Sequence, residues 1–238
     1  MKDKMLDCSI WSDVFAPLQN KRVGYFESIG NVGDKLIQMG MHKCLNYYGI
    51  EIVQDNFDFI LTSGGGNFGN LYPDEREHRE AALNTNCPVI VLPQTAYDDY
   101  EYNYPYHKVY FREMESFKNY KNPLFAPDLS LCLTYEPKAA EFKRGIFFRN
   151  ERERRLDLQH PENLGDPIAL VKEPIEYLEL AAKYELIITN RLHLAISGLI
   201  CGREVILLPN SYFKNKAVYE ASLRELGCKW QDDLSFLQ

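Results

Sequence analysis

The sequence has no long apolar run and no excess of positive charge. No stretch approaches the roughly 18–20 apolar residues that a membrane-spanning helix needs, so we expect no transmembrane segment. The opening MKDKMLDCSIW lacks the apolar region of a secretory signal, so we expect a cytoplasmic protein, with peripheral attachment to the inner face of the membrane left open. The net charge of −7 excludes broad attraction to nucleic acid, and an anionic ligand would need a locally basic pocket.

The cysteines form no C-x-x-C pair and no group with histidine at the spacing of a zinc site. The six of them stand at positions 8, 44, 87, 132, 201 and 228. This spacing is typical of buried thiols in a reducing compartment. We therefore expect neither a bound metal nor a cofactor.

Short β-branched or aromatic runs alternate with helical patterns along the whole chain. Strands are expected at 21–27, 50–54, 57–61, 88–92, 109–112, 124–126, 145–149, 185–189 and 204–208. Helices are expected at 35–48, 73–83, 113–120, 174–183, 191–200 and 214–226. This alternation predicts an α/β fold of parallel sheets with helices on both faces.

A proline- and charge-containing stretch at 135–144 indicates a division into two lobes. We place the boundary at residue 140, which gives Rossmann-like lobes at 1–140 and 141–238. Ligands of such folds bind beyond the carboxyl ends of the strands, so candidate residues should follow strands.

The first candidate is SIGNVGDKL, which joins an expected strand to an expected helix. Gly30 and Gly33 permit a tight turn, and Asn31 lies between them. Asp34 falls in the first helical turn, where its carboxylate would repel a phosphate. It suits an acceptor for hydroxyl groups or a base; the alternative is that it only complements the helix dipole.

The second candidate, GGGNFG at 64–69, matches the G-x-G-x-x-G pattern of dinucleotide sites. The next helix, however, starts only at Pro73, and the following strand ends without the acidic residue that would bind a ribose. We interpret the glycines as a sharp turn under a ligand, with Asn67 and the rings of Phe68 and Tyr72 at its edge. An ordinary glycine turn is the alternative.

The third candidate is TNRLHLAISGLICG, residues 189–202. Asn190 is expected to cap a helix, with Arg191 at its first position and His193 at its third. A helix N-terminus, an arginine fork and an imidazole would together bind an anion and supply a proton near neutral pH. The alternative is a core histidine beside a surface arginine.

Three more basic residues follow expected strands: Arg112, Arg149 and Lys214. Each alone is more often solvated, but their shared position favours a ligand contact. Most of the run RNERERR beyond Arg149 is interpreted as a solvated face.

Seven segments together resemble the polysaccharide pyruvyl transferase family. In order they are GNVGDKLI, GGGNFGNLYP, VLPQT, FREMES, APDLS, NRLHLAI and NSYFKNK, and they span residues 21–220 approximately. The resemblance implies two lobes like those of GT-B glycosyltransferases, with the second lobe reduced because the chain is short. It implies transfer of pyruvate from phosphoenolpyruvate to a hexose as a cyclic ketal, with release of phosphate.

The resemblance assigns contacts with phosphoenolpyruvate to Arg191, Leu192 and His193, and to Arg112. Because this ligand carries a carboxylate and a phosphate, we expect Arg149 and Lys214 to contribute as well. The acceptor saccharide, free or lipid-linked, would be held in the first lobe by Asn31, Asn67, Tyr72 and Gln94. His193 would assist proton transfer or phosphate departure, and Asp34 would accept a hydroxyl proton.

Two alternatives remain open at this point. A GT-B glycosyltransferase that uses a nucleotide sugar would also place a phosphate site in the second lobe. A saccharide-binding protein that has lost catalysis would keep only the first lobe's function.

Overall fold

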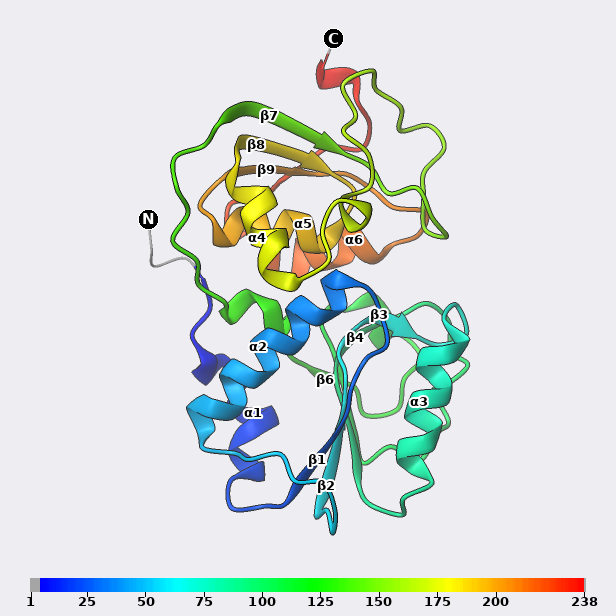
Figure 1. The fold of residues 1–238 in the computed structure, drawn as a ribbon. Coiled ribbons are helices and arrows are strands. Elements are labelled where there is room, and N and C mark those ends of the chain that lie inside the picture. Colours follow the sequence, from blue (N-terminus) through cyan, green and yellow to red (C-terminus); the bar gives the residue numbers. More distant parts are fainter. Residues whose placement is uncertain (1–4, 238) are drawn as a thin grey trace. The chain divides into compact units, whose positions relative to one another are not determined.

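The computed structural model describes residues 5–237, which form two compact units: residues 6–133, and residues 134–237 together with Met5 (Figure 1). The division was expected at residue 140, and the roles expected of the two parts stay predictions. The expected mixed α/β class with parallel sheets is confirmed, because all strand pairs in both sheets are parallel. Within the described residues, no helix is both long and apolar enough to cross a membrane.

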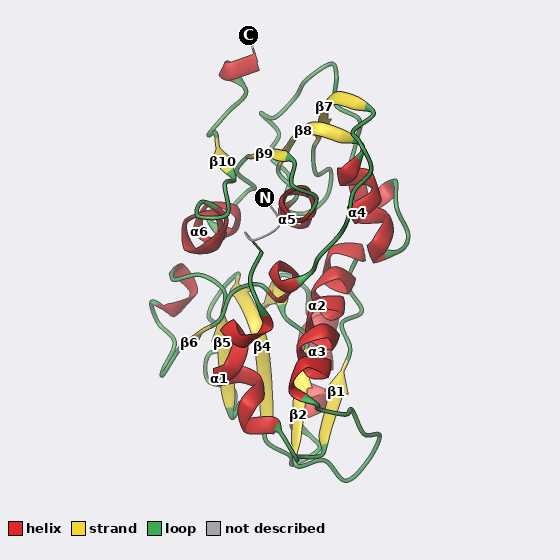
Figure 2. Cartoon of the chain, turned by 90° about the vertical axis from the view of Figure 1, so that its left-hand side faces the viewer, coloured by secondary structure: helices red, strands yellow, loops and turns green. Residues whose placement is uncertain are grey.

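The first unit contains a six-stranded sheet. Its strands are β1 Val23–Phe26, β2 Phe59–Thr62, β3 Gly65–Phe68, β4 Val89–Ala96, β5 Lys108–Phe111 and β6 Leu124–Phe125. They lie in the order β1-β2-β4-β5-β6, and β3 pairs with the end of β4. Helices α1 Ser12–Phe15 and α2 Val32–Tyr48 cover one face, and α3 Pro73–Leu83 covers the other (Figures 1 and 2).

The strand expected at 50–54 is reduced to one bridge, between Ile52 and Val23. Val23 also pairs with Phe59 of β2, so Ile52 lies on the opposite side of β1. The chain therefore steps outward from β1 through α2 and then returns across β1 to β2. This reversal puts α2 and α3 on opposite faces and creates a topological switch point at the carboxyl ends of β1 and β2.

Helix α2 begins and ends where the sequence chemistry dictates. Asn31 and Asp34 form a capping box at its start, and Gly49 ends it in the left-handed conformation at φ 65°. A Cβ atom on Gly40, in the middle of the helix, would lie 2.0 Å from the carbonyl oxygen of Leu129. Glycine at this position lets the 3-10 helix Leu129–Cys132 pack directly against α2.

The second unit contains a four-stranded sheet in the order β10-β9-β8-β7. Its strands are β7 Phe142–Phe147, β8 Tyr184–Thr189, β9 Glu204–Leu207 and β10 Lys229–Trp230. Helices α4 Pro174–Ala182, α5 Leu192–Ile200 and α6 Lys214–Val218 all lie on one face (Figures 1 and 2). The expectation of helices on both faces is wrong here. Right-handed crossovers that always step in the same direction place every helix on the same side.

The other face of this sheet is covered by irregular chain. Leu158 belongs to a buried cluster with Ile146, Ile188 and Leu208, and the C-terminal segment packs against it through Leu234 and Phe236. Loops and the chain end thus replace the second helical layer of a full doubly wound domain.

Three further local expectations are corrected. The helix expected at 113–120 is only the 3-10 turn Glu115–Phe117, because the Glu113 carboxylate binds the backbone N–H groups of Glu115 and Ser116 and closes a tight turn. The last helix continues from α6 only as the π-helical segment Tyr219–Leu223. Strand β10 was not predicted, because two paired residues give no periodic signal.

Candidate active site

The switch point of the first unit gathers the glycine segments and two carboxylates. Asn31 donates its backbone N–H to Asp34 Oδ2 at 2.9 Å. A Cβ atom on Gly30 would lie 2.2 Å from Asp34 Oδ2, and one on Gly65 would lie 3.1 Å from Asp34 Oδ1. The Asp34 carboxylate is therefore seated against both glycine segments that the sequence singled out, and only glycine leaves it room.

Glu75, which the sequence analysis did not assign, lies close to Asp34. It stands in the first turn of α3, is buried, and accepts a 2.5 Å hydrogen bond from Ser28 Oγ. Ser28 Oγ in turn accepts the backbone N–H of Gly30 at 3.0 Å. Burial raises the pKa of Glu75 and the negative charge of Asp34 raises it further, although the Ser28 hydrogen bond lowers it. The switch point thus holds a carboxylate beside a carboxyl group that retains its proton to higher pH than usual.

A buried ion pair holds the glycine stretch 64–69 in place. Arg79 donates from Nε and Nη2 to the two carboxylate oxygens of Glu101 at 2.8 and 2.6 Å. The same guanidinium donates to the Asn67 carbonyl and to Asn67 Oδ1, while Glu101 accepts the backbone N–H of Gly69 at 2.6 Å. The stretch is a clamped strand, β3, with a turn on either side, and not a free phosphate loop.

Asn67 and Gln94 stabilise the stretch 64–69 through buried hydrogen bonds. Gln94 is fully buried and donates both amide hydrogens, to the Ser63 carbonyl at 2.7 Å and to Asn67 Oδ1 at 2.9 Å. Its own amide oxygen accepts the Asn67 N–H. Gln94 is therefore not the free donor to a sugar that we expected, and contact between Asn67 and a saccharide stays a prediction. Tyr72 is half-buried at the position preceding α3.

Arg112 lies in the first unit and is fully buried there. It donates to Asp128 Oδ2 at 2.5 Å and to Thr95 Oγ1 at 2.9 Å. The segments FREMES, APDLS and VLPQT are thus tied together internally by this one side chain. Its geometry is that of a structural ion pair, in contrast to the ligand contact expected.

The second unit gathers three of the expected cations at the carboxyl edge of its sheet. Arg149 follows β7, Arg191 follows β8 and Lys214 follows β9. Each is buried and each is paired with carboxylates. Arg191 binds both oxygens of Asp166, at 2.8 and 2.7 Å, while Arg149 and Lys214 share one oxygen of Glu153.

Glu151 joins the two arginines. Its Oε1 lies 2.9 Å from Arg191 Nη2 and 3.3 Å from Arg149 Nη2. Of the three cations and three carboxylates in this cluster, Glu151 is the exposed one, with 40% of its side chain accessible. Glu151 and Glu153 belong to the run RNERERR, most of which was expected to be solvated; Glu153 is the buried exception. The alternation of arginine and glutamate in this run was the sequence signal that could have indicated these ion pairs.

The start of α5 differs from expectation by one residue. Asn190 does not cap the helix, because its Oδ1 accepts the backbone N–H of Arg149 at 2.7 Å. Arg191 occupies the capping position without a side-chain cap, which puts His193 at the second helical position and half-exposed. Leu192 is buried in the core and so contributes packing.

Two buried donors in this cluster have no hydrogen-bond acceptor among the described residues. They are Arg149 Nε and Asn190 Nδ2. Leaving a buried donor unmatched is costly, and such donors are a common mark of sites where a polar ligand completes the network.

Comparisons with known proteins identify the family of the chain. The sequence profile described as polysaccharide pyruvyl transferase matches residues 5–212. Since this covers most of the chain, the protein belongs to the polysaccharide pyruvyl transferase family. Family membership supports transfer of a pyruvyl group to a polysaccharide.

Three individual proteins are similar to the chain. General stress protein 30 of Bacillus subtilis (strain 168) is 26% identical over 89% of this chain and 78% of its own length. The protein named "Putative pyruvyl transferase EpsO", from the same organism, is 36% identical over 29% of this chain and 26% of its own. The crystal structure of KP1_0663 from Klebsiella pneumoniae has a TM-score of 0.76 at 23% identity, covering 95% of this chain and 99% of that one, and so shows the fold.

The buried ion pair between Arg79 and Glu101 predicts a large loss of stability on replacement of Arg79. Arg79→Met leaves the Glu101 carboxylate buried without its partner, which typically costs about 3–5 kcal/mol. Urea unfolding measures this. Arg22→Met, which removes an exposed ion pair with Asp55 in the same unit, is the control and should cost less than about 1 kcal/mol. Equal losses of unfolding free energy in the two variants would contradict a stabilising role for the Arg79–Glu101 pair.

The second unit's cluster holds three cations and three carboxylates, so its charges balance. We therefore predict that Glu151→Gln strengthens anion binding. Neutralising this carboxylate leaves the cluster of three cations and two remaining carboxylates with one net positive charge, worth about 1 kcal/mol or several-fold in affinity for an anion nearby. Calorimetric titration with inorganic phosphate measures the change. Glu162→Gln, which breaks a surface pair with Arg144, should leave phosphate affinity unaltered. Unchanged or weaker binding in Glu151→Gln would show that this cluster is not an anion site.

Proposed function

We propose that the protein transfers pyruvate from phosphoenolpyruvate to two hydroxyls of one hexose, forming a cyclic ketal and releasing inorganic phosphate. The observation that carries the proposal is the convergence of Arg149, Arg191 and Lys214 at one sheet edge, with two unmatched buried donors among them. No cofactor is invoked. The acceptor is a saccharide precursor, free or lipid-linked, and the reaction is placed in the cytoplasm or at the inner face of the membrane.

Phosphoenolpyruvate carries a carboxylate and a phosphate, so a pocket for it must supply several cationic donors. Three cations here are balanced by three carboxylates: Glu151, Glu153 and Asp166. Binding would therefore proceed by exchange, in which the substrate's oxygens replace the exposed Glu151 at the two arginines. Arg191, held by both oxygens of Asp166, keeps its orientation during that exchange.

The chemistry needs one proton delivered to carbon and one proton removed from each of the two attacking hydroxyls. Addition of the first sugar hydroxyl to C2 of phosphoenolpyruvate accompanies protonation of C3, which becomes a methyl group. The second hydroxyl then displaces phosphate from C2, and its proton leaves with the phosphate. We assign the donor-side proton transfer to His193 and removal of a hydroxyl proton to Asp34.

The carboxyl group of Glu75 extends this assignment. Burial raises the pKa of Glu75, and neighbouring carboxyl groups in different environments play different roles in other active sites. Glu75 would hold a proton and donate a hydrogen bond to a saccharide oxygen while Asp34 accepts one. Asn31 and Asn67 lie beside this pair, on the same glycine segments.

The test is phosphate release from phosphoenolpyruvate in the presence of a panel of hexosides. His193→Ala should abolish release, because proton transfer contributes about 10²–10⁴-fold in rate, with little change in melting temperature. His160→Ala, in the same unit, is the control and should remain active. Full activity of His193→Ala would contradict the role of His193, and an absence of release with every acceptor would contradict the reaction.

Ligand-binding measurements on the same protein distinguish two other functions. Thermal stabilisation by UDP- or GDP-sugars but not by phosphoenolpyruvate would indicate a nucleotide-sugar glycosyltransferase. Saccharide binding without any phosphate release would indicate a binding protein that has lost catalysis.

Replacement of Glu75 should raise stability and lower activity together. Since the pKa of Glu75 is raised from its ordinary value of 4.5, its ionisation costs folding free energy as pH rises through the folded pKa. Glu75→Gln keeps an acceptor for Ser28 and removes that cost. Wild type and variant should therefore melt alike at about pH 4, and the variant should melt higher at about pH 8.

Thermal melts across this pH range, combined with the phosphate assay, measure both effects. The exposed neighbour Asp74 provides the control Asp74→Asn, which should change neither the pH dependence nor the rate. A variant at position 75 that is no more stable at high pH, or that keeps full activity, would contradict the assignment.

A further inference from the structure

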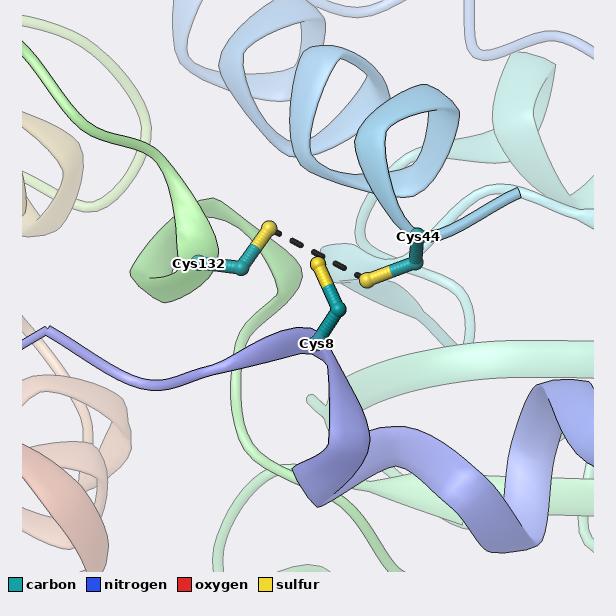
Figure 3. Close-up of side chains that lie close together, drawn as sticks. All are labelled: Cys8, Cys44 and Cys132. Carbon is teal, nitrogen blue, oxygen red and sulfur yellow. Dashed lines mark hydrogen bonds between the residues drawn. The ribbon is translucent and has the colours of Figure 1, made fainter. Parts of the chain in front are cut away.

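Three cysteines that are far apart in the sequence converge inside the first unit (Figure 3). Cys8 lies in the 3-10 helix Cys8–Trp11, Cys44 in α2, and Cys132 at the end of the 3-10 helix Leu129–Cys132. Their sulfur atoms all lie within 4.8 Å of one another, and Cys44 Sγ is 3.9 Å from Cys132 Sγ. All three are buried.

The three sulfurs are brought together by rigid elements. Asp7 caps the helix that carries Cys8, and Asp128 caps the one that carries Cys132. The glycine at position 40 lets the second of these helices lie directly on α2, one turn before Cys44. The side chains point toward one another from three separate segments, so the arrangement is formed by the fold and does not depend on one flexible loop.

The spacing fits a sulfur-bound metal ion. Three sulfurs held at about 2.3 Å from one ion lie about 3.8–4.0 Å apart in tetrahedral or trigonal geometry. The observed 3.9 Å edge falls in that range. The other three cysteines, Cys87, Cys201 and Cys228, do not belong to this group.

The surroundings favour a divalent ion. Three thiolates around a doubly charged cation carry a net charge of −1, and a buried net charge needs a compensating partner. Lys43 supplies one, because its ammonium group donates to the carbonyl oxygen of Cys132 at 2.6 Å. Thiolate ligands select soft ions, and among divalent ones zinc is the common partner of cysteine.

We propose that Cys8, Cys44 and Cys132 form a binding site for one soft divalent cation of the zinc class. Binding replaces three S–H bonds with three metal–sulfur bonds and releases the three protons to solvent, without oxidation or reduction. The contact of Cys132 Sγ with the Leu129 carbonyl oxygen, at 3.1 Å, is given up in the process. No side chain among residues 5–237 completes a fourth ligand within the group, so that position is left to a water molecule or a backbone oxygen.

A bound ion would cross-link three segments of the first unit. It ties the segment before α1 and the segment after β6 to the centre of the first unit. A ligand that binds the folded chain but not the unfolded one raises stability by mass action. The inference rests on the cysteine geometry alone and is independent of the proposed transfer reaction.

Titration of the reduced, metal-free full chain with Cd²⁺, a soft spectroscopic substitute, tests the proposal. Wild type should take up one ion per chain, develop a thiolate-to-metal charge-transfer band in the ultraviolet and release protons in proportion. Zn²⁺ should compete for the same site and raise the melting temperature. Elemental analysis of the protein purified without chelator provides a second measurement.

Two sets of variants separate this site from cysteines in general. Cys8→Ser, Cys44→Ser and Cys132→Ser should each lose the band and the zinc-dependent rise in melting temperature. The triple variant Cys87→Ser/Cys201→Ser/Cys228→Ser should retain both. Circular dichroism shows which variants are folded.

Three outcomes would overturn the proposal. Wild type that binds no Cd²⁺ at one equivalent would show a cluster of protonated thiols only. Loss of the band in the triple control variant would place the ion elsewhere. Retention of wild-type binding by a folded variant at position 8, 44 or 132 would remove that residue from the ligand set and, with it, the site as described.

Discussion

The site of the first unit depends on the buried ion pair between Arg79 and Glu101. In a low-dielectric interior neither charge would be tolerated alone, and further hydrogen bonds surround the pair: Asn67 accepts from the arginine, and Gly69 and Tyr106 donate to the glutamate. The pair thus converts the flexibility of a glycine-rich stretch into a fixed backbone. Because that backbone is fixed, Gly65 can sit against the Asp34 carboxylate without a side chain in between.

The two units differ in the order in which their strands follow one another across the sheet. In the first, the strand order reverses at β1, and the carboxyl groups of Asp34 and Glu75 lie at that reversal. In the second, the described strands follow one another without a reversal, and the candidate side chains stand after β7, β8 and β9 instead. A row of strand ends suits an extended polar cluster of arginines and carboxylates.

The sequence predicted the parts of the structure that local chemistry controls. Caps and periodicity located α2, α3 and α4 to within a few residues, and the rule that ligands follow strands indicated Asp34, Arg149 and Arg191. It did not reveal the partners, since Asp166 and Glu153 meet their cations only through the fold, and exposed and buried glutamates look alike in a sequence. For the same reason Cys8, Cys44 and Cys132 gave no spacing signal, because ligands contributed by three separate elements have no fixed spacing.

The charge balance of the second unit bears on selectivity. A cluster with surplus positive charge would bind any anion, whereas one whose cations are already paired binds only a ligand that offers enough oxygens to replace the carboxylate it displaces. Glu151 is the carboxylate most easily displaced, since it is the most exposed member and bridges both arginines with a single oxygen. Asp166, bound through both oxygens, is the member that stays. A ligand with two anionic groups can replace more of the lost contacts than a singly charged one, which agrees with the phosphoenolpyruvate site proposed above.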